Sequence, residues 1–214
     1  VRVFPVEQVR YRGETTAAAA VRRNTWLVEG VAAAEARDAA DPDRIKRSLM
    51  ARSVRLTEGM APAAFRAAQG AADALGVTAP LEIYQAAGAE NAAIHLVHSP
   101  ALLEVRGRML TLLGDAESCA LFGHELGHYL AHGPSHPDAP LGLVSQWILS
   151  DPHVPEHAVM AVRQLSMARE ITADRFGLLA AGSLEAALRL ELVATTGLSV
   201  DALAFDVQTY LDQC

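Results

Sequence analysis

The most constraining feature of the sequence is the pattern His124-Glu125-Leu126-Gly127-His128, because its chemistry depends on helical spacing. In an α-helix, residues four positions apart lie on nearly the same face, separated by one turn of about 5.4 Å. Both imidazoles are therefore predicted to bind one metal ion, with ligand bonds of about 2.1 Å. Glu125 is predicted to lie beside the water that the metal activates and to act as general base.

The flanking residues predict where this helix begins and ends. Asp115 is expected as the N-cap, since acidic and small polar residues are favoured there. Gly133 and Pro134 are expected to end the helix, because proline cannot continue it. The pattern also arises by chance, so two histidines on an ordinary helix remain the alternative at this point.

A catalytic zinc site takes three protein ligands and leaves one position open. Glu170 is the predicted third ligand, on a long helix expected over residues 156–181. Asp174 lies one turn further along the same face, where a carboxylate can accept the free ring N–H of a ligating histidine. An exposed acidic face paired with Arg169 and Arg175 is the alternative for these two carboxylates.

His132 continues the face of the two histidines but lies eight residues from His124. That separation is about 12 Å along a helix, too far for both rings to bind one ion. His132 is therefore expected to make a favourable contact with the dipole at the helix C-terminus.

The rest of the chain is predicted to be mostly helical. Helices are expected over residues 15–40, 44–55 and 63–75 from their apolar periodicity. The strand signals predict three short strands at 81–84, 91–97 and 102–105. In the second strand, Ala92 and Ile94 are expected to face the core by the two-residue period.

Composition excludes several function classes. The formal net charge is −7, and residues 71–214 carry 6 Lys and Arg against 17 Asp and Glu, so the half with the histidines has no basic footprint for nucleic acid. No apolar run reaches the length of about 18 residues that a membrane span needs. Two cysteines predict no disulfide framework. The chain begins at Val1, so a removed signal peptide would not be visible, and we expect the bacterial cytoplasm rather than the periplasm.

Two motifs together resemble a known family. The sequence His124-Glu125-Leu126-Gly127-His128, followed by Glu170-Ile171-Thr172-Ala173-Asp174, is similar to the gluzincin metallopeptidases of the HtpX and CAAX prenyl protease type. Asn91-Ala92-Ala93 stands where that family carries Asn-Ala-Phe-Ala, with Ala93 in place of the aromatic residue. The resemblance covers roughly residues 60–182, and it points to the soluble branches because no membrane span is predicted.

This resemblance implies a fold and a domain division. The expected fold is α+β and predominantly α-helical. It would be zincin-like, with a small three-stranded sheet, the helix of the histidine motif and a second helix that carries the glutamate ligand. Residues 1–58 have no counterpart in the family, so we expect a helical extension there, acting as an adaptor or regulatory cover. Residues 59–214 would form the metallopeptidase domain.

The resemblance also implies a function. The chain would be a zinc endopeptidase with one Zn²⁺ ion, Glu125 as base and Asp174 orienting a ligand; the ligands would be His124, His128 and Glu170. Asn91, Ala92 and Ala93 would form the rim of the cleft, where a polypeptide substrate pairs as an extra strand. Two alternatives remain: a latent or non-proteolytic zinc-bearing chaperone or binding protein, and a helical interaction module without metal. The oligomeric state is left open.

Overall fold

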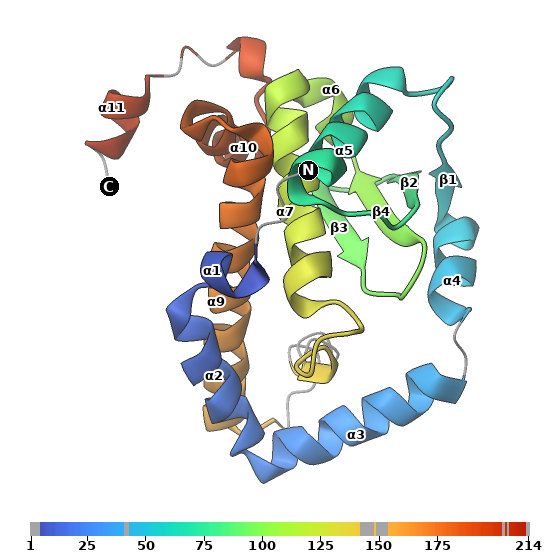
Figure 1. The fold of residues 1–214 in the computed structure, drawn as a ribbon, viewed down its shortest axis with the longest axis vertical. Helices are drawn as coiled ribbons and strands as arrows, with labels where there is room; N and C mark the ends of the chain where they lie inside the picture. The colour runs from blue at the N-terminus through green and yellow to red at the C-terminus, as the bar shows by residue number, and fades with distance from the viewer. Residues whose placement is uncertain are drawn as a thin grey trace.

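The chain is arranged around α7 (Asp115–His132), which lies between a small sheet and α9 (Glu156–Ala181) (Figure 1). The arrangement comes from a computed structural model, which describes residues 5–40, 43–141, 148, 154–202, 204 and 206–212. The remaining helices are α1 (Val6–Val9), α2 (Arg12–Arg22), α3 (Thr25–Ala40), α4 (Arg44–Arg52), α5 (Pro62–Leu75), α6 (Met109–Leu112), α10 (Leu184–Thr196), the 3₁₀ turn η1 (Val200–Ala202) and α11 (Val207–Leu211). The predicted α+β, mainly helical class is confirmed.

Over the described residues the sheet has four strands rather than the three predicted. Its order is β1 (Ser53–Arg55), β2 (Leu81–Ala86), β4 (Ala101–Arg106) and β3 (Asn91–His95), with β2 and β4 parallel and both outer strands antiparallel to their neighbours. The missed strand is β1, which falls inside the helix predicted over 44–55. Three residues are too few to give a period-two signal, and β1 forms because it pairs with β2.

One face of the sheet packs against α5 and α7. Ile83, Leu103 and Val105 from the two central strands are buried in this core, and Ala92 and Ile94 of β3 pack against it. The predicted inward orientation of Ala92 and Ile94 is therefore confirmed. This core also contains residues of α7, so it fixes the position of the histidine motif along β3.

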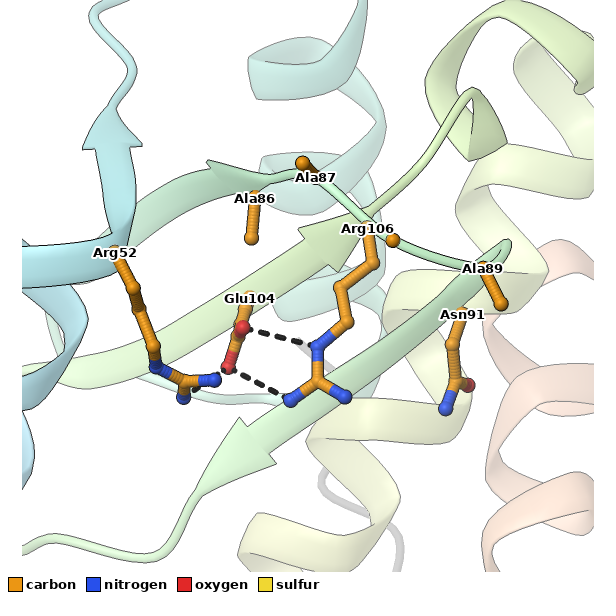
Figure 2. A pocket seen from close by; sticks show the side chains of 8 residues that line it. Arg52, Ala86, Ala87, Ala89, Asn91, Glu104 and Arg106 are labelled. Atoms are coloured by element: carbon orange, nitrogen blue, oxygen red, sulfur yellow. Dashed lines mark hydrogen bonds and ion pairs between the residues drawn. The ribbon is translucent and has the colours of Figure 1, made fainter.

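The opposite face of the sheet holds a buried carboxylate. Glu104 is fully buried and receives hydrogen bonds from Arg52 at 2.8 Å and Arg106 at 2.9 Å (Figure 2). A ring nitrogen of His95 also lies 2.9 Å from its carboxylate. Burial acts to raise the pKa of Glu104, but these partners lower it below its usual value. Since a buried charge is costly unless it is paired, the cluster ties α4 and β3 to the central strand β4.

Glycines let α7 and α9 approach each other closely. A Cβ added at Gly123 would lie 2.3 Å from Ala180 Cβ and 3.1 Å from Gly177 Cα. Contacts pair early residues of α7 with late residues of α9: Cys119 Sγ lies 3.4 Å from the Ala180 carbonyl oxygen, and His124 lies against Asp174. The two helices are therefore antiparallel, and side chains on their facing surfaces meet over short distances.

We expect Gly123→Ala to destabilise the fold although alanine is the better helix former. Alanine gains about 1 kcal/mol of helix propensity over glycine, but overpacking typically costs about 1–3 kcal/mol, and the contact with Ala180 leaves no room. Gly70→Ala in α5 is the matched control, because a Cβ there meets nothing within 4 Å. Urea unfolding should show Gly70→Ala gaining stability and Gly123→Ala losing it. Equal gains would contradict the packing argument.

α1 and α2 pack along α9 on the side away from the sheet, whereas α3 runs across the bottom of the view towards α4 (Figure 1). Val21 and Leu27 lie in a second core with Val162 and Leu165 of α9. The helix predicted over residues 15–40 is two helices, α2 and α3, separated at residues 23–24. The domain division at residue 58 stays a prediction. None of the described helices has the length and apolar character needed to cross a membrane.

Candidate metal centre

Three predicted ligand atoms converge at the contact between α7 and α9. His124 Nε2 lies 3.2 Å from His128 Nε2 and 3.3 Å from Glu170 Oε2, and His128 Nε2 lies 3.6 Å from the same carboxylate oxygen. Tetrahedral ligands with bonds of about 2.05 Å to zinc are about 3.4 Å apart. The three separations fall around this value, so the residues fit a single ion of this size. The group formed by His124, His128 and Glu170 is able to hold a metal ion.

Local sequence explains why both histidines leave one face. α7 runs unbroken from Asp115 to a C-cap at Gly133, as the glycine–proline pair predicts. The predicted N-cap was wrong by one residue: Gly114 is the N-cap, and Asp115 is the first residue of the helix. An acidic residue is still favoured at that place because it faces the positive end of the helix dipole.

Asp174 contacts the ring of His124, with Oδ1 2.9 Å from Nδ1. The carboxylate of Asp174 favours a proton on Nδ1, so Nε2 is the nitrogen that would bind a metal ion once its own proton is released. Burial acts to lower the pKa of His124, but Asp174 and Glu170 raise it to about 10. The two imidazoles in turn hold the pKa of Glu170 well below its usual value, against the effect of burial. This charge distribution favours a cation.

Glu125 is 6 % exposed and lies between α7 and the sheet. Burial raises the pKa of its carboxyl group, although His124 and His128 act in the opposite direction, and the backbone N–H of Ile94 in β3 donates a hydrogen bond to it. A carboxylate with a raised pKa accepts a proton more readily at neutral pH, as a general base must. The arrangement also brings the backbone of β3 next to the ligand histidines.

The side chains of the predicted cleft rim do not join the ligand group. Asn91 accepts a hydrogen bond from the Ala92 N–H and lines a pocket of about 270 Å³ with Arg52, Glu104 and Arg106 (Figure 2). Ala92 packs against the core. Ala93 pairs with Glu104 across β3 and β4. β3 therefore meets the site through its backbone.

His132 has a different environment from the one predicted. It is 1 % exposed, with Nδ1 3.3 Å from His128 Nδ1 and Nε2 3.0 Å from Glu14 Oε1. Burial lowers the pKa of His132 to about 4. A neutral ring has no charge to interact with the helix dipole, so the expected dipole contact is replaced by a hydrogen bond to Glu14.

Sequence reasoning missed two acidic residues near the site. Glu14 belongs to the segment expected to be an extension, and no spacing rule links it to a histidine more than a hundred positions away. Glu191 of α10 has a raised pKa, caused first by burial and then by the charge of Asp174. Only the packing of α2 and α10 against the two long helices brings these carboxyl groups close.

Comparison of the chain with protein-family models, with characterised proteins and with solved structures finds no match. The resemblance to gluzincins and the zincin-like topology therefore stay predictions. Two imidazoles and a carboxylate at these distances are a ligand set that supports zinc chemistry.

Proposed function

We propose that this chain is a zinc-dependent endopeptidase of the gluzincin type. The observation that carries the proposal is the spacing of 3.2–3.6 Å among His124 Nε2, His128 Nε2 and Glu170 Oε2. Two imidazole nitrogens and one carboxylate oxygen are a ligand set that catalytic zinc uses, whereas magnesium and calcium prefer oxygen alone. Three protein ligands leave a coordination position for water or substrate.

Glu125 supplies the general base in this proposal. A zinc ion held by His124, His128 and Glu170 would lower the pKa of a bound water and polarise the carbonyl of the scissile bond. Glu125 accepts the proton of the attacking water and returns it to the leaving amine. Its hydrogen bond from the Ile94 N–H holds the carboxylate on the sheet side of the histidines, and Asp174 holds the ring of His124.

The edge strand β3 is the proposed substrate-binding element. Within the described sheet, β3 pairs with β4 on one side only. An extended peptide can add to such an edge through main-chain hydrogen bonds. A substrate bound this way would lie next to Glu125, because that carboxylate already contacts the backbone of Ile94. The proposed substrate class is therefore an extended polypeptide.

Exposure favours an open site over a latent one. The side chain of Glu170 is 57 % exposed, and that of Asp174 is 51 % exposed. The described part of the N-terminal segment contacts α9 through Thr172 and Arg175 instead. These residues lie about 200° and 100° around the helix from Glu170 and Asp174, respectively. The N-terminal segment therefore binds a different side of α9 and leaves the carboxylate of Glu170 accessible.

Metal removal tests the proposal. We expect casein cleavage to disappear after dialysis against a chelator and to return when one equivalent of Zn²⁺ is added, because Glu125 as general base needs the metal to lower the pKa of the water and to polarise the scissile carbonyl. Magnesium at the same concentration should not restore cleavage, since it binds imidazole poorly. Cleavage that persists in protein shown by elemental analysis to be free of metal would refute the proposal.

A further inference from the structure

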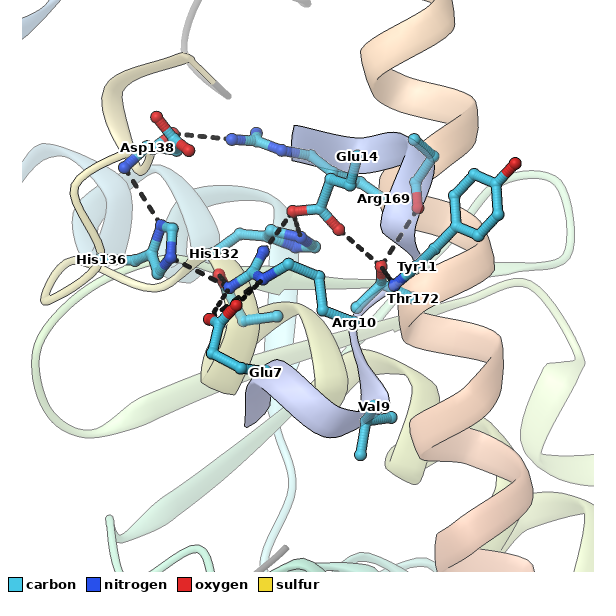
Figure 3. A network of polar contacts seen from close by, with 12 residues as sticks. Glu7, Val9, Arg10, Tyr11, Glu14, His132, His136, Asp138, Arg169 and Thr172 are labelled. Atoms are coloured by element: carbon cyan, nitrogen blue, oxygen red, sulfur yellow. Dashed lines mark hydrogen bonds and ion pairs between the residues drawn. The ribbon is translucent and has the colours of Figure 1, made fainter. Parts of the chain in front are cut away.

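A buried carboxylate from the N-terminal segment contacts His132, the last residue of α7 (Figure 3). The side chain of Glu14 is only 4 % exposed. Its Oε1 lies 3.0 Å from His132 Nε2, and its Oε2 accepts a hydrogen bond of 2.5 Å from the Thr172 hydroxyl. Arg10 forms a close ion pair with the same carboxylate. Burial alone would raise the pKa of Glu14, but these partners lower it to about 2, so the group is ionised at neutral pH.

The contacts fix the direction of each hydrogen bond. Because an ionised carboxylate only accepts, His132 Nε2 must donate to Glu14. If His128 binds a metal ion through Nε2, its proton is on Nδ1, and His132 Nδ1, 3.3 Å away, is placed to accept it. His128 then donates from Nδ1, which leaves its Nε2 lone pair facing His124 and Glu170. The sequence of bonds therefore selects the tautomer of His128 that can bind a metal ion through Nε2.

The segment that carries Glu14 is anchored at several points. Arg175 donates hydrogen bonds to the carbonyl oxygens of Val9 at 3.1 Å and Arg10 at 3.3 Å, and Thr172 Oγ1 accepts from the Tyr11 N–H at 3.1 Å. Arg10 also donates to the carbonyl oxygen of Ala131, one residue from His132. The anchors join the segment to α7 and to α9, the two helices that supply the metal ligands.

We propose that Glu14 is a positioning residue of the metal centre, which sets the tautomer and orientation of His128 through His132. Each ligand histidine would then be oriented through its Nδ1 atom: His124 by Asp174, and His128 by the Glu14–His132 pair. The inference rests on the proposed metal site but does not require that the protein cleave peptides. The N-terminal segment is in this proposal a part of the site rather than a separate cover.

Zinc affinity in a double-mutant cycle tests the proposal. Partners that orient a metal-bound histidine typically contribute about 10–100-fold in metal affinity. We expect His132→Phe and Glu14→Leu each to weaken zinc binding within this range, measured by competition with a chromogenic chelator. Because Glu14 acts through His132, the double variant should bind no more weakly than His132→Phe alone. Glu14→Gln keeps an oxygen that accepts from His132 Nε2, so it should bind zinc more tightly than Glu14→Leu.

Tyr84→Phe is the matched control for general destabilisation. It removes a buried hydrogen bond of 2.6 Å to Glu82 on the far face of the sheet, and it should lower the unfolding temperature without changing zinc affinity. Zinc affinities of the two single variants within threefold of wild type, or losses that add in the double variant, would overturn the proposal. If the variants weaken zinc binding as expected but the wild type cleaves no peptide, only the peptidase function is refuted. If the wild type binds no zinc, both the peptidase function and the role of Glu14 are refuted.

The tautomer can be measured in the wild type, which removes any dependence on the folding of variants. In zinc-free protein, ring ¹⁵N shifts should show His128 protonated at Nδ1 and His132 protonated at Nε2. The opposite assignment for His128 would overturn the proposal even if every variant failed to fold, because Glu14 could not then select the metal-binding tautomer.

Discussion

Glu125→Gln is expected to reduce kcat for peptide hydrolysis by about 10²–10⁴, the range that general acid–base catalysis typically contributes. The amide keeps the size of the side chain and can still accept a hydrogen bond from the Ile94 N–H, but it cannot take a proton from water. Glu125 is not in the ligand group, so zinc should still bind with one equivalent per chain. Initial rates on a fluorogenic peptide and elemental analysis of the same sample measure both quantities.

Glu117→Gln is the matched control for this variant. Glu117 is also a buried glutamate of α7, but it lies in the first turn, two turns before the histidine motif. Its substitution makes the same change of a carboxyl group to an amide and should leave kcat within about threefold of wild type, because Glu117 lies about 10 Å along the helix from His124. If Glu125→Gln cleaves the peptide at the wild-type rate, the proposed base does not act in hydrolysis.

Glu170→Ala is expected to lower zinc affinity by more than about 100-fold, because loss of a direct ligand should cost more than loss of a residue that only orients one. Cleavage should fall in parallel at limiting zinc. With Glu170 gone, two imidazoles remain, and the negative charge that raises the pKa of His124 is reduced. Isothermal titration of the metal-free protein with Zn²⁺ measures the change.

Glu156→Ala controls for the loss of a carboxylate from the same helix. Glu156 is exposed in the first turn of α9, more than three turns from the ligands, and its removal should leave zinc affinity unchanged. Equal zinc affinities of Glu170→Ala and wild type would exclude Glu170 as a ligand. Glu170 would then be a carboxylate that contacts the two histidines without binding a metal ion.

Local rules predicted the two helices that matter most. The long helix expected over 156–181 has these bounds, and α7 ends where Gly133 and Pro134 predict. Both results follow from interactions within a few residues of each boundary, namely caps and apolar periodicity. The shared face of His124 and His128 is equally local, because helical geometry alone places residues four apart together.

Two predictions were wrong because the partner was distant in the sequence. β1 was not predicted because three residues become a strand only by pairing with β2. His132 was assigned to the helix dipole because its actual partner, Glu14, is separated from it by more than a hundred residues. The cleft-rim role of Asn91 stays a prediction, and its position beside Arg52 and Arg106 depends on how α4 packs on the sheet.

The sequence by itself determined which side chains leave α7 on one face and which carboxylates leave α9 together, because helix geometry repeats over a few residues. It did not determine that the two faces meet, or that a glutamate near the N-terminus lies behind the second histidine. Those contacts arise from close helix packing at Gly123 and Gly177 and from buried charges that must find partners. Such interactions act across the whole chain, so only the tertiary structure decided them.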